Sequence, residues 1–242
     1  MAHDQATPGA VTRRPSEPLR PRRGPRPAAA AALAACAAAA LTMTAGAAGA
    51  VPAPASGPSA ATIVARSGIA GACDSWRASV ARCNVASLVA IDMARSEEGL
   101  PRLVLPSGYQ RMGVVEQLET VTNAERLARG LPVWSGPRPG LTAEAAAGIA
   151  ASSDPVGPLG RTWVSNLAVG VLTVLQADFE WMYDDGPGGT NLDCRPPSWR
   201  YCWAHRDNIL RRWPAALGIA DRATAGGRLA LGELAVEVAK PS

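Results

Sequence analysis

One histidine carries the most reactive side chain of the chain outside its N-terminal segment. His205 has an imidazole that titrates near neutral pH, so it can act as a general base. Asp184 could orient that imidazole and Ser165 could serve as the nucleophile, which is the combination a hydrolase uses. Ser165, however, lacks the Gly-x-Ser-x-Gly context of a nucleophile elbow. The alternative is that His205 bonds a backbone group beneath Trp199 and Trp203 and has a structural role only.

A glycine-rich loop offers oxygen atoms of the kind that calcium binds. The hard ligands are Asp184, Asp185, Asn191 and Asp193, with glycine carbonyls between them. Their spacing is not that of an EF-hand, and the alternative is a polar turn in which the aspartates cap backbone amides. The sequence therefore predicts no cofactor, with calcium as the weak candidate.

Tryptophan and tyrosine residues are concentrated in the same part of the sequence, although the whole chain contains a single phenylalanine. They could form the floor of a glycan or lipid groove, or they could be core residues packed beside a disulfide. The group consists of Trp181, Tyr183, Trp199, Tyr201, Trp203 and Trp213.

Four cysteines remain once Cys36, which lies in the N-terminal apolar run, is set aside. They are Cys73, Cys83, Cys194 and Cys202, and an even number in an exported chain indicates two disulfides among three possible connectivities. The local pairs 73–83 and 194–202 close short loops. Ten residues of continuous helix would hold Cys73 and Cys83 about 15 Å apart, so that pair requires an intervening turn. Buried free thiols are the alternative.

Apolar periodicity predicts the elements that must position these residues. Helices are expected over Asn84–Glu98, from Val114 to Ala128, over Ala143–Ala151 with Thr142 as N-cap, and from Leu172 to Met182. Alternation then predicts a hairpin with a turn at residues 224–227, and the change of apolar parity near Gly232 predicts a β-bulge there. Together these signals predict an α+β fold in which helices cover a small antiparallel sheet.

The first 50 residues resemble a targeting segment. Six arginines precede an alanine-rich, nearly charge-free run from Ala28 to Ala50, which ends in residues that suit signal cleavage. A lipoprotein box at Cys36, a twin-arginine signal at Arg13-Arg14 and a membrane-spanning helix are the alternatives. We expect residues 1–50 to be a signal peptide, 51–70 a Pro/Ala/Ser/Gly-rich linker and 71–242 one secreted domain, with surface attachment through the linker left open.

The charge balance argues against a nucleic-acid partner. Residues 1–50 contain six arginines against Asp4 and Glu17, which accounts for the whole net charge of +4. Residues 51–242 therefore carry 18 basic and 18 acidic residues, whereas nucleic-acid binding needs a basic surface. No later stretch is apolar and long enough to span a membrane, and we expect a monomer.

The order of several short motifs resembles the CAP family, the SCP-like group of cysteine-rich secretory proteins, antigen 5 and pathogenesis-related proteins. The motifs, which fall between about residues 114 and 239, are Thr122-Asn123-Ala124-Glu125-Arg126 with Gly130-Leu131-Pro132, Ser165-Asn166-Leu167-Ala168, Trp181, His205-Arg206-Asp207-Asn208-Ile209-Leu210 and Leu217-Gly218-Ile219-Ala220. The stretch from Trp181 to Arg206 is similar to exported actinobacterial members. The resemblance implies an α/β/α sandwich, secretion, and a shallow cleft that in many relatives binds lipids, sterols or a divalent metal.

The departures from the family pattern matter as much as the match. Complete clefts in the family present two histidines and two acidic residues, but His205 is the only histidine after His3, so a two-histidine metal site is excluded. The usual Glu-Asn is Ser165-Asn166 here, and the remaining acid should be Asp184, with Glu180 as its neighbour. By the resemblance, the ligand-binding residues are His205, Asp184, Glu180, Asn166, Trp181 and Trp203.

We therefore expect a secreted CAP-like binding module, non-enzymatic rather than enzymatic, for an apolar or amphipathic ligand or a cell-envelope component. The first alternative is a hydrolase of peptide or cell-wall substrates that uses His205 with an acidic partner. The second is a purely structural exported domain.

Overall fold

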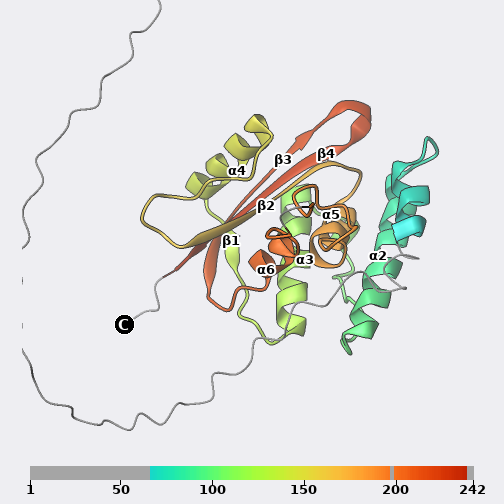
Figure 1. Cartoon of the computed structure of the whole chain (residues 1–242), viewed down its shortest axis with the longest axis horizontal. Coiled ribbons are helices and arrows are strands. Elements are labelled where there is room, and N and C mark those ends of the chain that lie inside the picture. Colours follow the sequence, from blue (N-terminus) through green and yellow to red (C-terminus); the bar gives the residue numbers. More distant parts are fainter. Residues whose placement is uncertain (1–65, 197–198, 239–242) are drawn as a thin grey trace, which may run out of the picture. The chain divides into compact units, whose positions relative to one another are not determined.

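A four-stranded mixed sheet organises the helices of the computed structural model, which describes residues 66–196 and 199–238. The strands lie in the order β1 (Ser135–Pro137), β3 (Ala215–Ala223), β4 (Leu229–Glu237) and β2 (Trp163–Val171) (Figure 1). The predicted hairpin is present as β3 and β4, and β2, which was not predicted, pairs antiparallel with β4, whereas β1 runs parallel to β3. Ser-Gly-Pro shows no alternation of apolar and polar residues, so β1 could not be predicted from its own residues. The predicted signal peptide and residues 51–65 of the predicted linker lie outside the described residues.

Helices cover both faces of this sheet. α4 (Pro139–Ala151) packs on one face, where Ala145 and Ile149 meet Ala220 and Ala230. The opposite face contacts the larger core, which includes residues of α2 (Val80–Glu97), α3 (Val114–Ala128), α5 (Val174–Met182) and α6 (Ala204–Ile209) (Figure 1). Shorter helical turns are η1 (Ala70–Asp74), η2 (Tyr109–Arg111) and η3 (Ala225–Gly227).

The predicted bulge at Gly232 is wrong. β3 and β4 pair without interruption through Ala220 and Gly232, and the register shift lies instead between Val169 and Val171 on β2. The parity changes because β4 is buried on both faces, so its apolar residues need not alternate. Gly232 is needed for space, since a Cβ there would lie 3.0 Å from the Ala145 carbonyl oxygen and 3.2 Å from Ile149.

The predicted helices are present and α3 has the predicted bounds, but α2 begins at Val80 rather than Asn84, α5 at Val174 rather than Leu172, and α4 at Pro139 rather than Ala143. Thr142 is not the N-cap of α4, because the helix begins at Pro139, and Thr142 lies inside it. Proline suits the first turn of a helix, where its missing N–H leaves no bond unmade. α4 ends at Ala151, and the next residue, Ser152, adopts the left-handed conformation, so the chain leaves the helix axis there.

Both local disulfides are present. Cys73 pairs with Cys83 and Cys194 pairs with Cys202, with Cα–Cα distances of 4.7 and 4.5 Å. The turn that the first pair requires separates η1 from α2. Residues 66–69 are already helical and Ile69 is buried, so the end of the predicted linker belongs to the folded part.

Buried arginine contacts fix α6 against α3. The Arg126 guanidinium stacks 3.9 Å from the ring centre of Trp134 and donates to the carbonyl oxygens of Ile209, at the end of α6, and of Trp213. Arg126, the last residue of the Asn-Ala-Glu-Arg motif, thus holds the end of the helix that carries His205.

Candidate functional site

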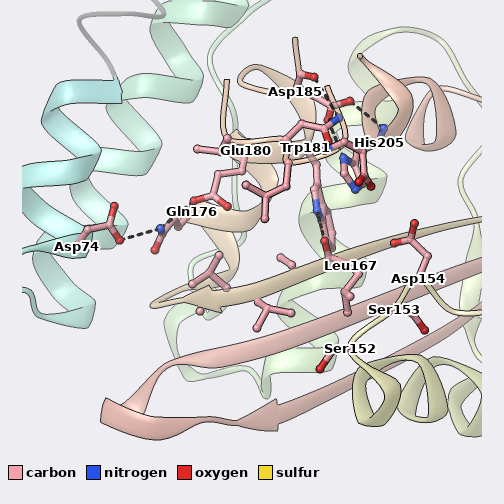
Figure 2. A pocket seen from close by; sticks show the side chains of 18 residues that line it. Asp74, Ser152, Ser153, Asp154, Leu167, Gln176, Glu180, Trp181, Asp185 and His205 are labelled. Carbon is pink, nitrogen blue, oxygen red and sulfur yellow. Dashed lines mark hydrogen bonds and ion pairs between the residues drawn. The ribbon is translucent and has the colours of Figure 1, made fainter. Parts of the chain in front are cut away.

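A polar cleft of about 540 Å³ opens beside β2, between the end of α4, α5 and the loop that precedes α6 (Figure 2). Trp181 lies between two groups of polar side chains, with Gln176 and Asp74 at one end and His205, Asp185 and Asp154 at the other. The lining residues are Asp74, Ser152, Ser153, Asp154, Leu167, Ala168, Val169, Gly170, Val171, Gln176, Glu180, Trp181, Asp185, Thr190, Asn191, Leu192, Asp193 and His205.

The carboxylate beside His205 is Asp185 rather than the predicted Asp184. The Nδ1 atom of His205 lies 2.6 Å from Oδ1 of Asp185, whose side chain is fully buried. Because an ionised carboxylate only accepts, Nδ1 carries the proton and donates, which leaves Nε2 as the free nitrogen. The second oxygen of Asp185 accepts from the backbone N–H groups of His205 and Arg206. Asp185 thus fixes both the start of α6 and the imidazole.

Burial and charge act in opposite directions on this pair. Burial lowers the pKa of His205, but the hydrogen bond and charge of Asp185, with the charges of Asp154 and Asp193, outweigh it and raise the pKa above its usual value. Burial likewise raises the pKa of Asp185 despite the contact with His205. The imidazole therefore holds a proton more readily than an exposed histidine does.

Trp181 forms the wall behind the imidazole. Its ring stacks on His205 with centroids 6.3 Å apart and an interplanar angle of 19°, and its Nε1 donates to the Leu167 carbonyl oxygen. The side chain is only 2% exposed, so it supports the site more than it offers a stacking surface.

Glu180 is a cleft carboxyl whose pKa is shifted toward neutral pH. Its Oε1 accepts from Nε2 of Gln176 at 2.9 Å, and the same nitrogen lies 3.4 Å from Oδ1 of Asp74. Burial raises the pKa of Glu180 to about 7, although the Gln176 bond opposes the shift. A carboxyl that titrates near neutral pH in a cleft is a feature of functional sites.

Asp184, the predicted orienting acid, has a different partner. Its fully buried side chain pairs with Arg66, and its Oδ2 accepts from the Thr190 N–H at 3.2 Å. With Asp184 engaged there and Asp185 bound to His205 and Asn191, the predicted calcium ligands do not converge. Among the described residues, no group of three or more His, Cys, Asp or Glu side chains is placed to hold a metal ion.

Ser165 and Asn166 lie on β2 but do not line the cleft. Ser165 is buried, and its carbonyl oxygen accepts from Nδ2 of Asn208. Asn166 donates to Glu233 at 3.1 Å and accepts from Asn208. The hydroxyl groups in the cleft come instead from Ser152, Ser153 and Thr190, which were not predicted.

The other predicted tryptophans also have structural positions. Trp203 precedes α6 in the left-handed conformation and covers Gly186, where an added Cβ would lie 2.3 Å from its ring. Trp199 and Tyr201 are half exposed and do not belong to the cleft lining. The tryptophan-lined groove expected from the sequence is therefore absent from the described cleft.

Asp74, Asp154 and Gln176 also line the cleft, and the sequence analysis singled out none of them as a site residue. The signal that could have suggested Gln176 is its spacing of four from Glu180, which puts both on one helix face.

No protein family, curated protein or solved structure matches this chain. In the part of the chain that the structure describes, we find no helix with the length and apolar character needed to cross a bilayer.

Proposed function

We propose that the protein is an exported CAP-like binding module whose cleft takes a polar, positively charged ligand. The observation that carries the proposal is the charge of the lining. Its titratable groups are five carboxyls and one imidazole, and none of the described lining residues is arginine or lysine. Asp74 pairs with Arg228 and Asp185 with His205, which leaves Asp154 and Asp193, and Glu180 in its ionised form above about pH 7, to face a ligand.

The carboxyls of the lining argue for a ligand that carries cationic groups. Ala168, Val171 and Trp181 are buried, whereas Val169 and Leu192 are exposed and leave room for apolar contacts beside those groups. A lipid or sterol would leave the carboxyl groups without hydration or partners, which is unfavourable. Amine or guanidinium groups on a peptide or a cell-envelope polymer would satisfy them.

Two features support the exported CAP-like part of this proposal. The disulfides are typical of oxidising compartments. α4 lies on one face of the sheet with α3 and α5 on the other, which is the layered arrangement that the resemblance implies.

Calorimetric titration of the secreted protein with tetra-arginine, tetra-glutamate and a C12 fatty acid tests the ligand class. Tetra-arginine should bind, and added salt should weaken it because the attraction is ionic. Asp154→Asn with Glu180→Gln should weaken binding several-fold. Glu144→Gln, on the exposed side of α4, is the control. Preference for the fatty acid, or equal binding by the double variant, would contradict the proposal.

The second candidate is a hydrolase, favoured by the His205–Asp185 bond and by the pKa of Glu180 near 7. In that mechanism, Nε2 of His205 would act as base and protonated Glu180 as acid. Cleavage of the peptide probe that is lost in His205→Gln would favour this activity over binding alone.

A further inference from the structure

An arginine from the predicted linker reaches the loop that holds the cleft together. Arg66 donates through Nε to Oδ1 of Asp184 at 2.7 Å, contacts the same oxygen through a second nitrogen, and donates through NH1 to the Gly188 carbonyl oxygen at 2.6 Å. The guanidinium is part-buried, while the carboxylate is fully buried. One side chain therefore ties two points of the loop to the N-terminal segment.

Asp184 is the base of that loop. Its carbonyl oxygen accepts from the Thr190 N–H at 3.0 Å, and its Oδ2 accepts from the same group. The next residue, Asp185, holds His205, and residues 190–193 line the cleft. A shift of Asp184 would thus move the partner of the imidazole.

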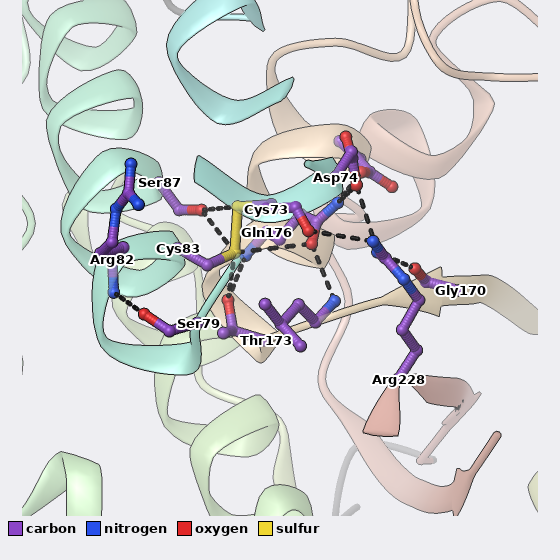
Figure 3. The surroundings of a disulfide bond; sticks show 12 residues. Cys73, Asp74, Ser79, Arg82, Cys83, Ser87, Gly170, Thr173, Gln176 and Arg228 are labelled. Atoms are coloured by element: carbon purple, nitrogen blue, oxygen red, sulfur yellow. Dashed lines mark hydrogen bonds and ion pairs between the residues drawn. A yellow bond between two sulfur atoms is a disulfide. The ribbon is translucent and has the colours of Figure 1, made fainter. Parts of the chain in front are cut away.

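The other end of the N-terminal segment is anchored independently (Figure 3). The disulfide joins Cys73 to α2, and Arg228 donates to the carbonyl oxygens of Cys73 and Gly170 and pairs with Asp74. Residues 66–74 therefore span two fixed points, and loss of Arg66 would release only the end at Asp184.

We infer that Arg66 is a positioning residue for the His205–Asp185 pair. The inference concerns the cleft of the proposed function, but it requires no ligand. Without Arg66, the Asp184 carboxylate would be buried beside no cation, which is strongly unfavourable. Relief requires protonation of Asp184 or movement of the loop, and movement would weaken the contact between Asp185 and His205.

The titration of His205 distinguishes this role from a simple charge effect. In the full chain carrying His3→Ala, His205 is the only histidine, so its NMR signals are unambiguous. The charged groups that act on it are Asp185, Asp154 and Asp193. Removing the Arg66 charge alone would raise the His205 pKa, because a nearby cation disfavours the imidazolium. Losing the Asp185 contact would lower it.

We expect Arg66→Ala to lower the His205 pKa and to shift the amide signals of residues 184–190. Arg66→Lys keeps the positive charge but loses the several N–H donors of the guanidinium. Its His205 pKa should therefore lie between those of Arg66→Ala and the parent protein. Arg77→Ala is the matched control, since that arginine stacks on exposed Trp76. An unchanged or raised His205 pKa in Arg66→Ala would overturn the inference. If Arg66→Ala does not fold, the same test applies to Arg66→Lys: a His205 pKa below that of the parent supports the inference, and an unchanged or raised pKa overturns it. Failure of tetra-arginine to bind the parent protein would count against the proposed function alone.

Discussion

Glu233 should make the protein less stable as the pH rises. This glutamate of β4 is 1% exposed, accepts from the Thr122 hydroxyl at 2.9 Å and from Asn166 at 3.1 Å, and is attracted by buried Arg126. Burial nevertheless outweighs these contacts and raises its pKa from 4.5 to about 7. The folded protein therefore keeps a proton that the unfolded chain releases.

The sign and size of the effect follow from this difference. Below pH 4.5, Glu233 is protonated in both states and its contribution to stability is complete. Between pH 4.5 and 7 only the folded state holds the proton, so the free energy of unfolding falls with rising pH and levels off above 7. A difference of about 2.5 between the two pKa values, at about 1.4 kcal/mol each, corresponds to about 3 kcal/mol.

Glu233→Gln isolates this contribution. The amide oxygen can accept from Asn166 while the amide nitrogen donates to the Thr122 hydroxyl, so the variant resembles protonated Glu233 at every pH. Urea unfolding at pH 5 and pH 8 should show that the wild type loses about 2.5 kcal/mol more than the variant over this range. Other buried acids, such as Glu180, titrate in both proteins and cancel in the comparison. Glu144→Gln, an exposed substitution, should follow the wild type.

An equally steep pH dependence in Glu233→Gln would refute the reasoning. It would mean that Arg126 stabilises the ionised carboxylate enough to offset its burial. The pH dependence would then have to come from the other buried acids.

Two further substitutions test how the fold is held together. Gly218→Ala should destabilise the protein by about 1–3 kcal/mol in thermal unfolding, because the new Cβ would lie 2.2 Å from the backbone carbonyl of Leu141. Gly140→Ala is the control and should be neutral in the same assay, because its Cβ would meet open space. Replacing Cys73 and Cys83 together by serine should lower the free energy of unfolding, measured in urea without reductant, by about 3 kcal/mol. A loss below about 1 kcal/mol would show that Arg228 and the core hold η1 in place without the disulfide.

Features encoded by neighbouring residues could be predicted from the sequence. The helix over Val114–Ala128 was predicted because its apolar stripe faces one core and ends before Gly130, which adopts a positive φ of 68°. The disulfides were among the predicted pairings because each closes a short loop. Both signals lie within about 15 residues, so no tertiary information was needed.

Features that depend on contacts across the sheet could not be predicted. β4 does not alternate between apolar and polar residues because α4 covers the face opposite the main core. No residue pattern within the strand indicates that a helix packs on that second face. β1 exists because Ser135 and Pro137 lie beside β3. In both cases, a segment distant in sequence decides the local structure.

The choice between Asp184 and Asp185 shows the same limit at the site. The family spacing counted from Trp181 favoured Asp184, whereas the structure turns that carboxylate toward Arg66. Asp185 becomes the partner of His205 because α6 starts directly after Trp203, whose left-handed backbone aims the first N–H groups of the helix at this carboxylate. A charged acceptor at the start of a helix is favourable, so the geometry that stabilises α6 also fixes the imidazole. The histidine and its acid are therefore coupled through the backbone of α6, which residue spacing alone does not reveal.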